Sequence, residues 1–373
     1  MPEQVLAAVH TGEKRLEIRE FPMPDVAPDC ALLKVEAAGM CSAYSSYSLA
    51  PKPAPLVLGH ENAGTLVKVG KVFAQRWGVE EGDFISLEEY IPCYHCEECL
   101  NGEYRHCYDV DGFHNDKMTR FGATPISKEP SLWGGYAQYL YLPINVAMQK
   151  MPRTVRPEVA AFMLPLANGV QWGVKQGHAG PGKTVLVQGP GPKGLGCVIA
   201  AKLFGASNII VSGLNRDKRR LEVAQALGAD HIINFEEEDL LDKVMEYTDG
   251  VGVDVSLDCT RTTTQQNIDN AAKALRRKNG IVVLPHGFHS PADKPIVYPL
   301  EILNGGNGTL TVARGHNHDS VRTSADWIAS GRHGIDQVSS HQFSLADTEK
   351  AFLAAHGSGV PDAVAITVTP WRE

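Results

Sequence analysis

The sequence predicts an α/β protein in which a β-rich domain is joined to a domain built on a doubly wound parallel sheet. The first 150 residues are rich in glycine and proline and carry short apolar runs such as 31–37 and 64–69, which is typical of turns and short strands. Beyond Arg153, apolar runs alternate with helical patterns, which predicts parallel strands joined by helices. The 373 residues are also too many for one hydrophobic core.

The second domain is predicted element by element. Residues 184–188 and 208–212 are short apolar runs bounded by turn residues, as expected of buried strands. The segments 194–205 and 217–228 have helical periodicity, and each ends on a glycine, a common helix terminator. Further strands are expected at 231–233, 253–259 and 280–284. We therefore expect domains at 1–152 and 153–297, with a return segment at 298–373 that completes the sheet edge and the first domain.

Composition and charge exclude several classes of protein. The formal net charge of -8 argues against a nucleic-acid-binding protein, which needs clustered Lys and Arg. No run of eighteen apolar residues occurs, and the start of the chain lacks a basic segment followed by an apolar one, so neither a membrane span nor a secretory signal is expected. Eight cysteines make a poor disulfide framework at this length, which favours thiolates bound to metal in a reducing cytoplasm.

A glycine-rich turn follows the first strand of the second domain. Residues 189–194 read Gly-Pro-Gly-Pro-Lys-Gly, a G-x-G-x-x-G pattern between a predicted strand and a predicted helix. In this setting Gly189 makes the tight turn, Gly191 admits a pyrophosphate to the backbone, and Gly194 lets helix and strand pack closely. We predict that these glycines and Leu195 contact a dinucleotide; the alternative is a glycine-rich turn with no ligand.

The end of the second strand bears on the choice of nicotinamide cofactor. An acidic residue there would bind the ribose of NAD, but Gly213 stands at that position. Arg216 follows and could pair with the 2′-phosphate of NADP. Asp217 could still reach the ribose from a longer loop, so the sequence favours NADP and leaves NAD open.

Four cysteines lie within fifteen residues. Cys93, Cys96, Cys99 and Cys107 form C-x2-C-x2-C-x7-C, which can close a tetrahedral all-thiolate zinc site in a lobe at about 90–110. Such a site stabilises a loop and leaves no position for substrate. An iron–sulfur cluster is the competing interpretation, but its final spacing is shorter and is followed by proline. A nucleic-acid zinc finger is disfavoured by the acidic balance.

Together these features resemble the medium-chain zinc alcohol dehydrogenase superfamily. The resemblance rests on the cysteine ladder, on the glycine turn, and on three segments: Gly39-Met40-Cys41, Gly59-His60-Glu61-Asn62-Ala63-Gly64 and Gly134-Gly135-Tyr136-Ala137-Gln138-Tyr139. It implies a GroES-like catalytic domain, a Rossmann domain, a cleft between them, and a homodimer or homotetramer. It also implies that Asn168 lies near the nicotinamide carboxamide.

The sequence departs from the family pattern at positions that take part in catalysis in the family. Leu164 stands where the family has a third metal ligand, Ala43 stands where it usually has a proton-relaying hydroxyl, and Tyr44 occupies an often acidic position. The remaining Cys41, His60 and Glu61 supply one sulfur, one nitrogen and one oxygen, an acceptable open zinc set. Either zinc bound there acts as a Lewis acid, or no catalytic zinc is present and Tyr44 or water supplies the proton.

We therefore predict an enzyme that transfers hydride between a nicotinamide and a small alcohol or carbonyl substrate. The second hypothesis is a zinc-independent, NADPH-dependent reductase of a conjugated double bond, for which Ala43 and Leu164 would be natural. A hypothesis of another class is a dinucleotide-binding protein without turnover. Trp133, Tyr44 and Tyr47 are candidates for the substrate pocket, and His286, His289, His316 and His318 are expected to lie mostly in surface loops.

Overall fold

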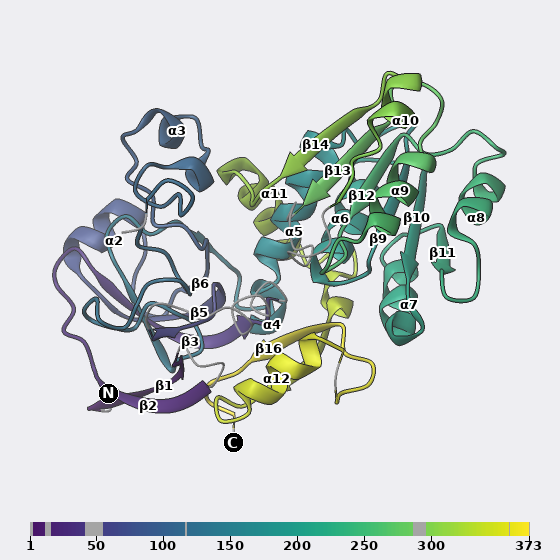
Figure 1. Ribbon diagram of the computed structural model, residues 1–373. Coiled ribbons are helices and arrows are strands. Elements are labelled where there is room, and N and C mark those ends of the chain that lie inside the picture. Colours follow the sequence, from purple (N-terminus) through teal and green to yellow (C-terminus); the bar gives the residue numbers. More distant parts are fainter. Residues whose placement is uncertain are drawn as a thin grey trace. The chain divides into compact units, whose positions relative to one another are not determined.

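The computed structural model describes residues 3–11, 16–41, 55–115, 118–285, 296–357 and 359–372 (Figure 1). These residues form two compact units. The first contains Met1–Leu164, Asn317–Gly331 and Ser339–Glu373, and the second contains Pro165–His316 and Arg332–Val338.

The first unit is built on two sheets. The larger has the order β15-β16-β3-β5-β6-β8, with β7 also paired to β3, and the smaller has the order β2-β1-β4. The strands of the larger sheet are β3 (Ala31–Gly39), β5 (Glu61–Val69), β6 (Phe84–Leu87), β7 (Tyr139–Leu142), β8 (Met148–Lys150), β15 (Ser339–Phe343) and β16 (Ala365–Val368). Those of the smaller sheet are β1 (Gln4–His10), β2 (Leu16–Pro22) and β4 (Leu56–Val57).

Strand β3 organises the larger sheet. It pairs antiparallel with β5, β7 and β16. Its sequence, Ala-Leu-Leu-Lys-Val-Glu-Ala-Ala-Gly, keeps only Lys34 and Glu36 partly exposed. A strand so apolar is stable only when both of its faces are covered, which explains its central position. Short helices join or cover these strands: α2 (Lys71–Trp77), α3 (Glu97–Leu100), η1 (Tyr104–His106), α4 (Pro157–Ala160), α11 (His318–Ala329) and α12 (Thr348–Ala355).

The second unit contains a six-stranded parallel sheet of order β11-β10-β9-β12-β13-β14. Its strands are β9 (Thr184–Gln188), β10 (Asn208–Gly213), β11 (His231–Asn234), β12 (Val255–Asp258), β13 (Ile281–Pro285) and β14 (Thr309–Ala313). Counted within the unit, this is the order 3-2-1-4-5-6 of the Rossmann fold, in which ligands bind beyond the carboxyl ends of the strands where the order reverses. The predicted fold class is confirmed.

Helices alternate with these strands, as the sequence predicts (Figure 1). Helix α6 (Pro192–Leu203) begins with proline, whose fixed φ and missing N–H suit a first helical position. Gly205 follows α6 with φ of +84°, and Gly228 follows α7 (Lys218–Ala226) with φ of +116°, so both lie in the left-handed region that favours glycine. The helices of this unit also include α5 (Met163–Gly169), η2 (Val170–Gln176), η3 (Asn215–Asp217), α7 (Lys218–Ala226), α8 (Leu240–Tyr247), α9 (Gln265–Lys273), α10 (Leu300–Gly305) and η4 (Ile335–Val338).

The chain passes from one unit to the other later than expected, since the sequence predicted boundaries at 152 and 297. The first boundary is Leu164/Pro165, because α4 packs on β3 and β5 of the first unit. The second is His316/Asn317, because β14 pairs with β13 and so extends the parallel sheet to Ala313. The return segment thus supplies a strand to the second unit before it rejoins the first.

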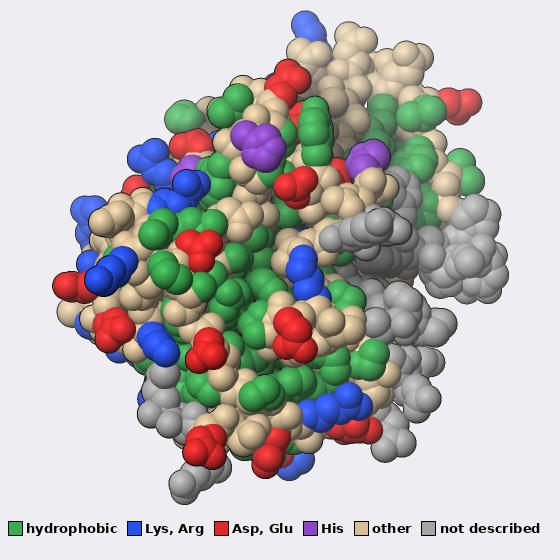
Figure 2. Space-filling view, turned by 90° about the vertical axis from the view of Figure 1, so that its left-hand side faces the viewer, with side chains coloured by type: hydrophobic (Ala, Val, Ile, Leu, Met, Phe, Trp, Pro, Cys, Tyr) green, Lys and Arg blue, Asp and Glu red, His purple; other side chains and the backbone are tan. Residues whose placement is uncertain are grey.

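Each unit has its own buried core. The largest buried side chains include Phe73, Phe84 and Tyr136 in the first unit and Trp172 in the second. Figure 2 shows one face of the molecule, on which basic and acidic side chains are interspersed rather than segregated by sign. Within the described ranges, every helix is too short or too polar to cross a bilayer.

Candidate active site and zinc lobe

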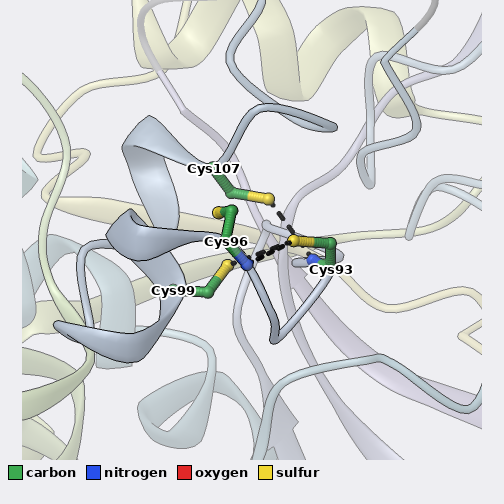
Figure 3. Close-up of side chains that lie close together, drawn as sticks. All are labelled: Cys93, Cys96, Cys99 and Cys107. Atoms are coloured by element: carbon green, nitrogen blue, oxygen red, sulfur yellow. Dashed lines mark hydrogen bonds between the residues drawn. The ribbon is translucent and has the colours of Figure 1, made fainter.

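The four cysteines of the ladder converge in the first unit. The Sγ atoms of Cys93, Cys96, Cys99 and Cys107 all lie within 4.8 Å of one another, and those of Cys93 and Cys99 are 3.9 Å apart (Figure 3). A tetrahedral zinc about 2.3 Å from each sulfur would hold the sulfurs about 3.8 Å apart, so this donor set fits zinc.

Backbone N–H groups support negative charge on these sulfurs. The Cys93 N–H donates to Cys107 Sγ over 3.3 Å, and the Cys96 N–H donates to Cys93 Sγ over 3.4 Å. Burial opposes ionisation of Cys96, but N–H groups, including that of Tyr108, lower its pKa to about 7. Burial instead raises the pKa of Cys99 and of Cys107, so before metal binds the lobe favours the thiolate at Cys96, and zinc itself would drive ionisation of the buried thiols.

The second cluster also lies in the first unit, as the sequence predicts. One ligand atom each from Cys41, His60 and Glu61 lies within 4.8 Å of the other two, and Cys41 and Glu61 are buried. His60 Nε2 is 3.7 Å from Glu61 Oε1. One sulfur, one imidazole nitrogen and one carboxylate oxygen leave a fourth position open, which is the donor set of a catalytic rather than a structural zinc.

Two glycines make room for this trio. Glu61 opens β5 and is paired with Gly39 at the end of β3, where a Cβ would lie 2.4 Å from Glu61 Oε2. Gly59 has φ of +100°, and a Cβ there would lie 2.8 Å from the backbone N of Gly135. The Gly135 N–H donates to the Gly59 carbonyl over 2.8 Å, which holds the chain just before His60. Alanine at 39 would have to displace the Glu61 side chain, and alanine at 59 would have to displace backbone atoms.

The electrostatics of the trio centre on His60. Burial opposes a positive charge on its ring, yet the charge of Glu89 and contacts with the other two trio members outweigh burial and raise its pKa well above the ordinary value. Glu89 Oε2 lies 3.6 Å from His60 Nδ1. Nearby, Tyr136 donates from its hydroxyl to the Gly39 carbonyl over 3.0 Å.

The glycine turn has a different geometry at each glycine. Gly189 has φ of +93°. A Cβ on Gly191 would meet nothing within 4 Å, whereas one on Gly194 would lie 2.0 Å from the Gly189 carbonyl oxygen. The Leu195 N–H donates to the Gly191 carbonyl over 2.8 Å and so starts the ladder of α6. Open space at the second glycine, at the start of a helix, is what a pyrophosphate requires.

The carboxyl ends of β10 and β12 flank this turn. Ser212 of β10 and Asp258 of β12 both pair with Gln188 of β9. Arg216 follows β10 and Arg261 follows β12, and both are exposed. Partial burial and the positive charge of Arg216 lower the pKa of Arg261, so the two guanidinium groups lie close enough to repel each other.

The structure brings Asn168 together with a histidine far away in the sequence. His316 Nδ1 lies 3.1 Å from Asn168 Oδ1, and His316 is fully buried. The prediction of surface-loop histidines is therefore wrong for His316, which follows β14 into the interior. His318 begins α11 with its Nδ1 3.8 Å from Glu88 Oε2.

Several residues singled out in the sequence lie outside the part of the chain that the structure describes. Ala43, Tyr44, Tyr47, His286 and His289 lie outside the described residues. Trp133, a candidate for the pocket, packs instead in the core of the first unit and donates from Nε1 to the Lys128 carbonyl over 2.8 Å. Leu164 is buried.

Sequence reasoning missed Glu89 and Arg120. Arg120 Nη2 lies 3.2 Å from Glu89 Oε2, on the oxygen that faces His60. The only local signal for Glu89 in the sequence was the pair Glu88-Glu89 directly after the apolar strand 84–87. In the structure Glu88 is 0% exposed and Glu89 is 8% exposed. A buried acid at such a place needs a partner, but spacing alone does not name one.

A Rossmann turn with open space at its second glycine, a thiolate quartet and a Cys-His-Glu cluster are the features of a zinc-binding nicotinamide oxidoreductase. Residues 27–153 match the alcohol dehydrogenase GroES-like domain, and residues 192–330 match the zinc-binding dehydrogenase domain. The chain belongs to the zinc-containing alcohol dehydrogenase family and is an NAD(P)-dependent enzyme.

Full-length relatives support this assignment. A probable alcohol dehydrogenase of Mycobacterium tuberculosis is 34% identical, and the alignment covers 96% of each chain. A sorbitol dehydrogenase of Bacillus subtilis is 31% identical over 95% of this chain and 94% of its own. A crystal structure of a zinc-binding dehydrogenase from Sinorhizobium meliloti bound to NADP shares the fold, with a TM-score of 0.82 and 23% identity over 99% of this chain and 100% of that chain.

Proposed function

We propose that the protein oxidises an alcohol to a carbonyl compound, or carries out the reverse reaction, with zinc held by Cys41, His60 and Glu61. The carbinol carbon loses a hydride to the oxidised nicotinamide and the hydroxyl loses a proton to solvent, which gives the carbonyl product, the reduced nicotinamide and one released proton. The observation that carries the proposal is the convergence of these three ligand atoms within 4.8 Å of one another, a set that would leave one position of a tetrahedral zinc for substrate.

The chain's own residues have separate tasks in this proposal. The thiolate of Cys41 and the carboxylate of Glu61 balance the charge of a divalent ion, and His60 provides a neutral nitrogen. Bound there, zinc would supply Lewis-acid polarisation of the substrate oxygen. In the second unit, the turn at Gly189, Gly191 and Gly194 with Leu195 would hold the pyrophosphate, and Asn168 would donate to or accept from the nicotinamide carboxamide.

Metal content tests the proposal directly. We expect two zinc ions per chain in the purified protein, one in the quartet and one in the trio. Cys41→Ser should retain one zinc and lose alcohol dehydrogenation, whereas Cys30→Ser, a buried thiol outside both clusters, should retain both. Unchanged turnover in Cys41→Ser would refute the zinc-assisted mechanism.

Buried Leu164 favours a second candidate, reduction of a conjugated double bond by NADPH without a catalytic zinc. Leu164 stands where the family pattern has a third ligand, and this chemistry puts hydride on carbon without a metal-polarised alcohol. Tyr44 or water would then supply the proton. A single zinc per chain, together with activity on enones but not on alcohols, would select this candidate.

For the cofactor we propose NADP in preference to NAD. Gly213 offers no carboxylate to the ribose, and Arg216 and Arg261 place two positive charges after β10 and β12, the strands on either side of β9. A 2′-phosphate would relieve the repulsion between them. A markedly lower KM for NAD than for NADP would contradict this choice.

We also propose a cytoplasmic homodimer or homotetramer. Strand β14 ends the parallel sheet, and the apolar side chains of Val312, Leu300 and Val297 around it are 47%, 65% and 71% exposed. An exposed sheet edge beside apolar groups is a ready surface for pairing with a second copy. None of the eight cysteines is in a disulfide, which fits a reducing compartment. Light scattering should give at least twice the 40.4 kDa chain mass, and Val312→Lys should lower it.

A further inference from the structure

The His60 ring is flanked by a carboxylate at each nitrogen. Nε2 lies 3.7 Å from Glu61 Oε1, and Nδ1 lies 3.6 Å from Glu89 Oε2. Because Glu61 belongs to the metal-ligand trio, Nε2 is the nitrogen that faces the metal position. With Nε2 on the metal, the hydrogen of the neutral ring would be on Nδ1, on the side of Glu89, whose Oε2 lies at ion-pair distance, slightly beyond a normal hydrogen bond.

Glu89 reaches His60 from a different part of the fold than the trio does. It follows β6 by two residues, and its carbonyl accepts a hydrogen bond from the Phe121 N–H over 3.1 Å. The next residue, Tyr90, forms an antiparallel bridge with Arg120. This pairing brings the Arg120 side chain to Glu89, where Nη2 lies 3.2 Å from Oε2.

The Glu89–Arg120 contact places a positive group against a buried carboxylate. Glu89 is 8% exposed, and a carboxylate so deeply buried is costly unless a positive group compensates it. Arg120 supplies that charge and is itself held with its guanidinium 5.5 Å from the centre of the Tyr90 ring. The acceptor for His60 is thus fixed in place by a group that does not belong to the trio.

We propose that Glu89, held by Arg120, is a positioning residue that orients His60 for zinc by accepting the hydrogen of Nδ1. The proposal rests on the zinc-bound trio of the proposed function. A carboxylate on the outer nitrogen selects one tautomer, fixes the plane of the ring and makes the inner nitrogen a stronger donor. The loss of such a partner typically lowers metal affinity by about 10- to 100-fold.

The test measures zinc affinity rather than turnover. Glu89→Gln removes the charge, Glu89→Ala removes the acceptor, and Glu89→Asp keeps the carboxylate. Each purified variant is titrated with a chelator of known affinity to obtain the dissociation constant of each of the two zinc ions. The matched control is Glu88→Gln, because Glu88 is also buried but its carboxylate faces His318 at 3.8 Å.

We expect the more weakly held zinc to bind about 10-fold less tightly in Glu89→Gln and about 100-fold less tightly in Glu89→Ala, with partial recovery in Glu89→Asp. The zinc of the cysteine quartet should keep its affinity in all three variants, which also reports an intact fold. In the cobalt-substituted protein, the visible absorption of the trio site should change in Glu89→Gln but not in Glu88→Gln.

Two outcomes overturn the inference. One is wild-type affinity for both zinc ions in Glu89→Ala; the other is an equal loss in Glu88→Gln. Should the Glu89 variants fail to fold, Arg120→Met leaves Glu89 and His60 in the chain but removes the ion-pair partner that holds the Glu89 carboxylate in place. Unchanged zinc affinity in that variant would also overturn the inference. A wild-type protein that binds only one zinc refutes the proposed function instead, so the two failures are distinguishable.

Discussion

Gly213 and Pro190 lie against each other where strand β10 meets the glycine turn: a Cβ built on Gly213 would lie 3.1 Å from both Cγ and Cδ of Pro190. A side chain at 213 would therefore press on the Pro190 ring and on Asp217 Cβ, also 3.1 Å away, and its neighbours would have to shift slightly. The missing ribose-binding acid is therefore matched by a close fit around Gly213. This leaves the positive side chains on the neighbouring loops to discriminate between cofactors.

Arg216→Ala should raise the KM for NADP roughly ten- to hundredfold while changing the KM for NAD little. A hydrogen bond to a charged phosphate is worth about 1.5–3 kcal/mol, and NAD lacks that phosphate. Steady-state kinetics with both cofactors measure the effect. Arg219→Ala is the matched control, because Arg219 is already paired with Glu222 at 3.0 Å. An equal increase for both cofactors would remove Arg216 from cofactor selection.

Cys99→Ser should cost the protein one zinc and loosen the lobe at 90–110. Without the metal, nothing bonds the four side chains that lie within 4.8 Å of one another into one unit, and the small cluster around Tyr104 and Val110 has little other support. Zinc analysis and limited proteolysis measure the change, and cleavage should concentrate in the lobe. Retention of all zinc and of protease resistance would disprove a structural role for the quartet.

Gly59→Ala should destabilise the protein more than Gly78→Ala and should release the zinc of the trio. Both glycines have positive φ, at +100° and +63°, so both alanines carry a strain of about 1–2 kcal/mol. Only at Gly59 would the new Cβ also meet backbone atoms at 2.8 Å, since nothing lies within 4 Å at Gly78. Thermal unfolding and zinc content compare the two; equal Tm values would mean that the close approach at Gly59 is tolerated.

Asp254→Asn should destabilise the second unit at neutral pH, and the difference from wild type should shrink in acid. Burial opposes ionisation of Asp254, but the Thr184 N–H, Arg276 and Lys183 lower its pKa below the ordinary 3.8. A lowered pKa in the folded state stabilises the protein above pH 3.8, and this stabilisation is lost as the pH falls through the folded value.

Urea unfolding measures this effect. We expect a loss of about 1–3 kcal/mol at pH 7, because charged hydrogen bonds to Asp254 are lost, and a smaller loss as the pH falls below about 4. Asp242→Asn, at an exposed position, is the control, and its small effect should not vary with pH in this way. A loss for Asp254→Asn that grows in acid would contradict the sign of the shift.

The sequence by itself determined the features that are local along the chain. Alternating apolar runs predicted the parallel strands, the turn at Gly189 to Gly194 predicted the dinucleotide site, and four cysteines within fifteen residues predicted the zinc lobe. Such signals can be read because the backbone geometry of a turn, or the reach of a metal-binding loop, depends on residues only a few positions apart.

Only the tertiary structure decided which distant residues meet. The pairing of β3 with β5 puts Gly39 opposite Glu61, and the bridge between Tyr90 and Arg120 brings a charged pair to His60. Strand β14 carries His316 to Asn168, although 148 positions separate them. These contacts follow from the register of the strands and from the order in which they cross. A shift of one residue in register would move a side chain to the other face of the sheet, and the spacing of residues along the chain does not specify the register.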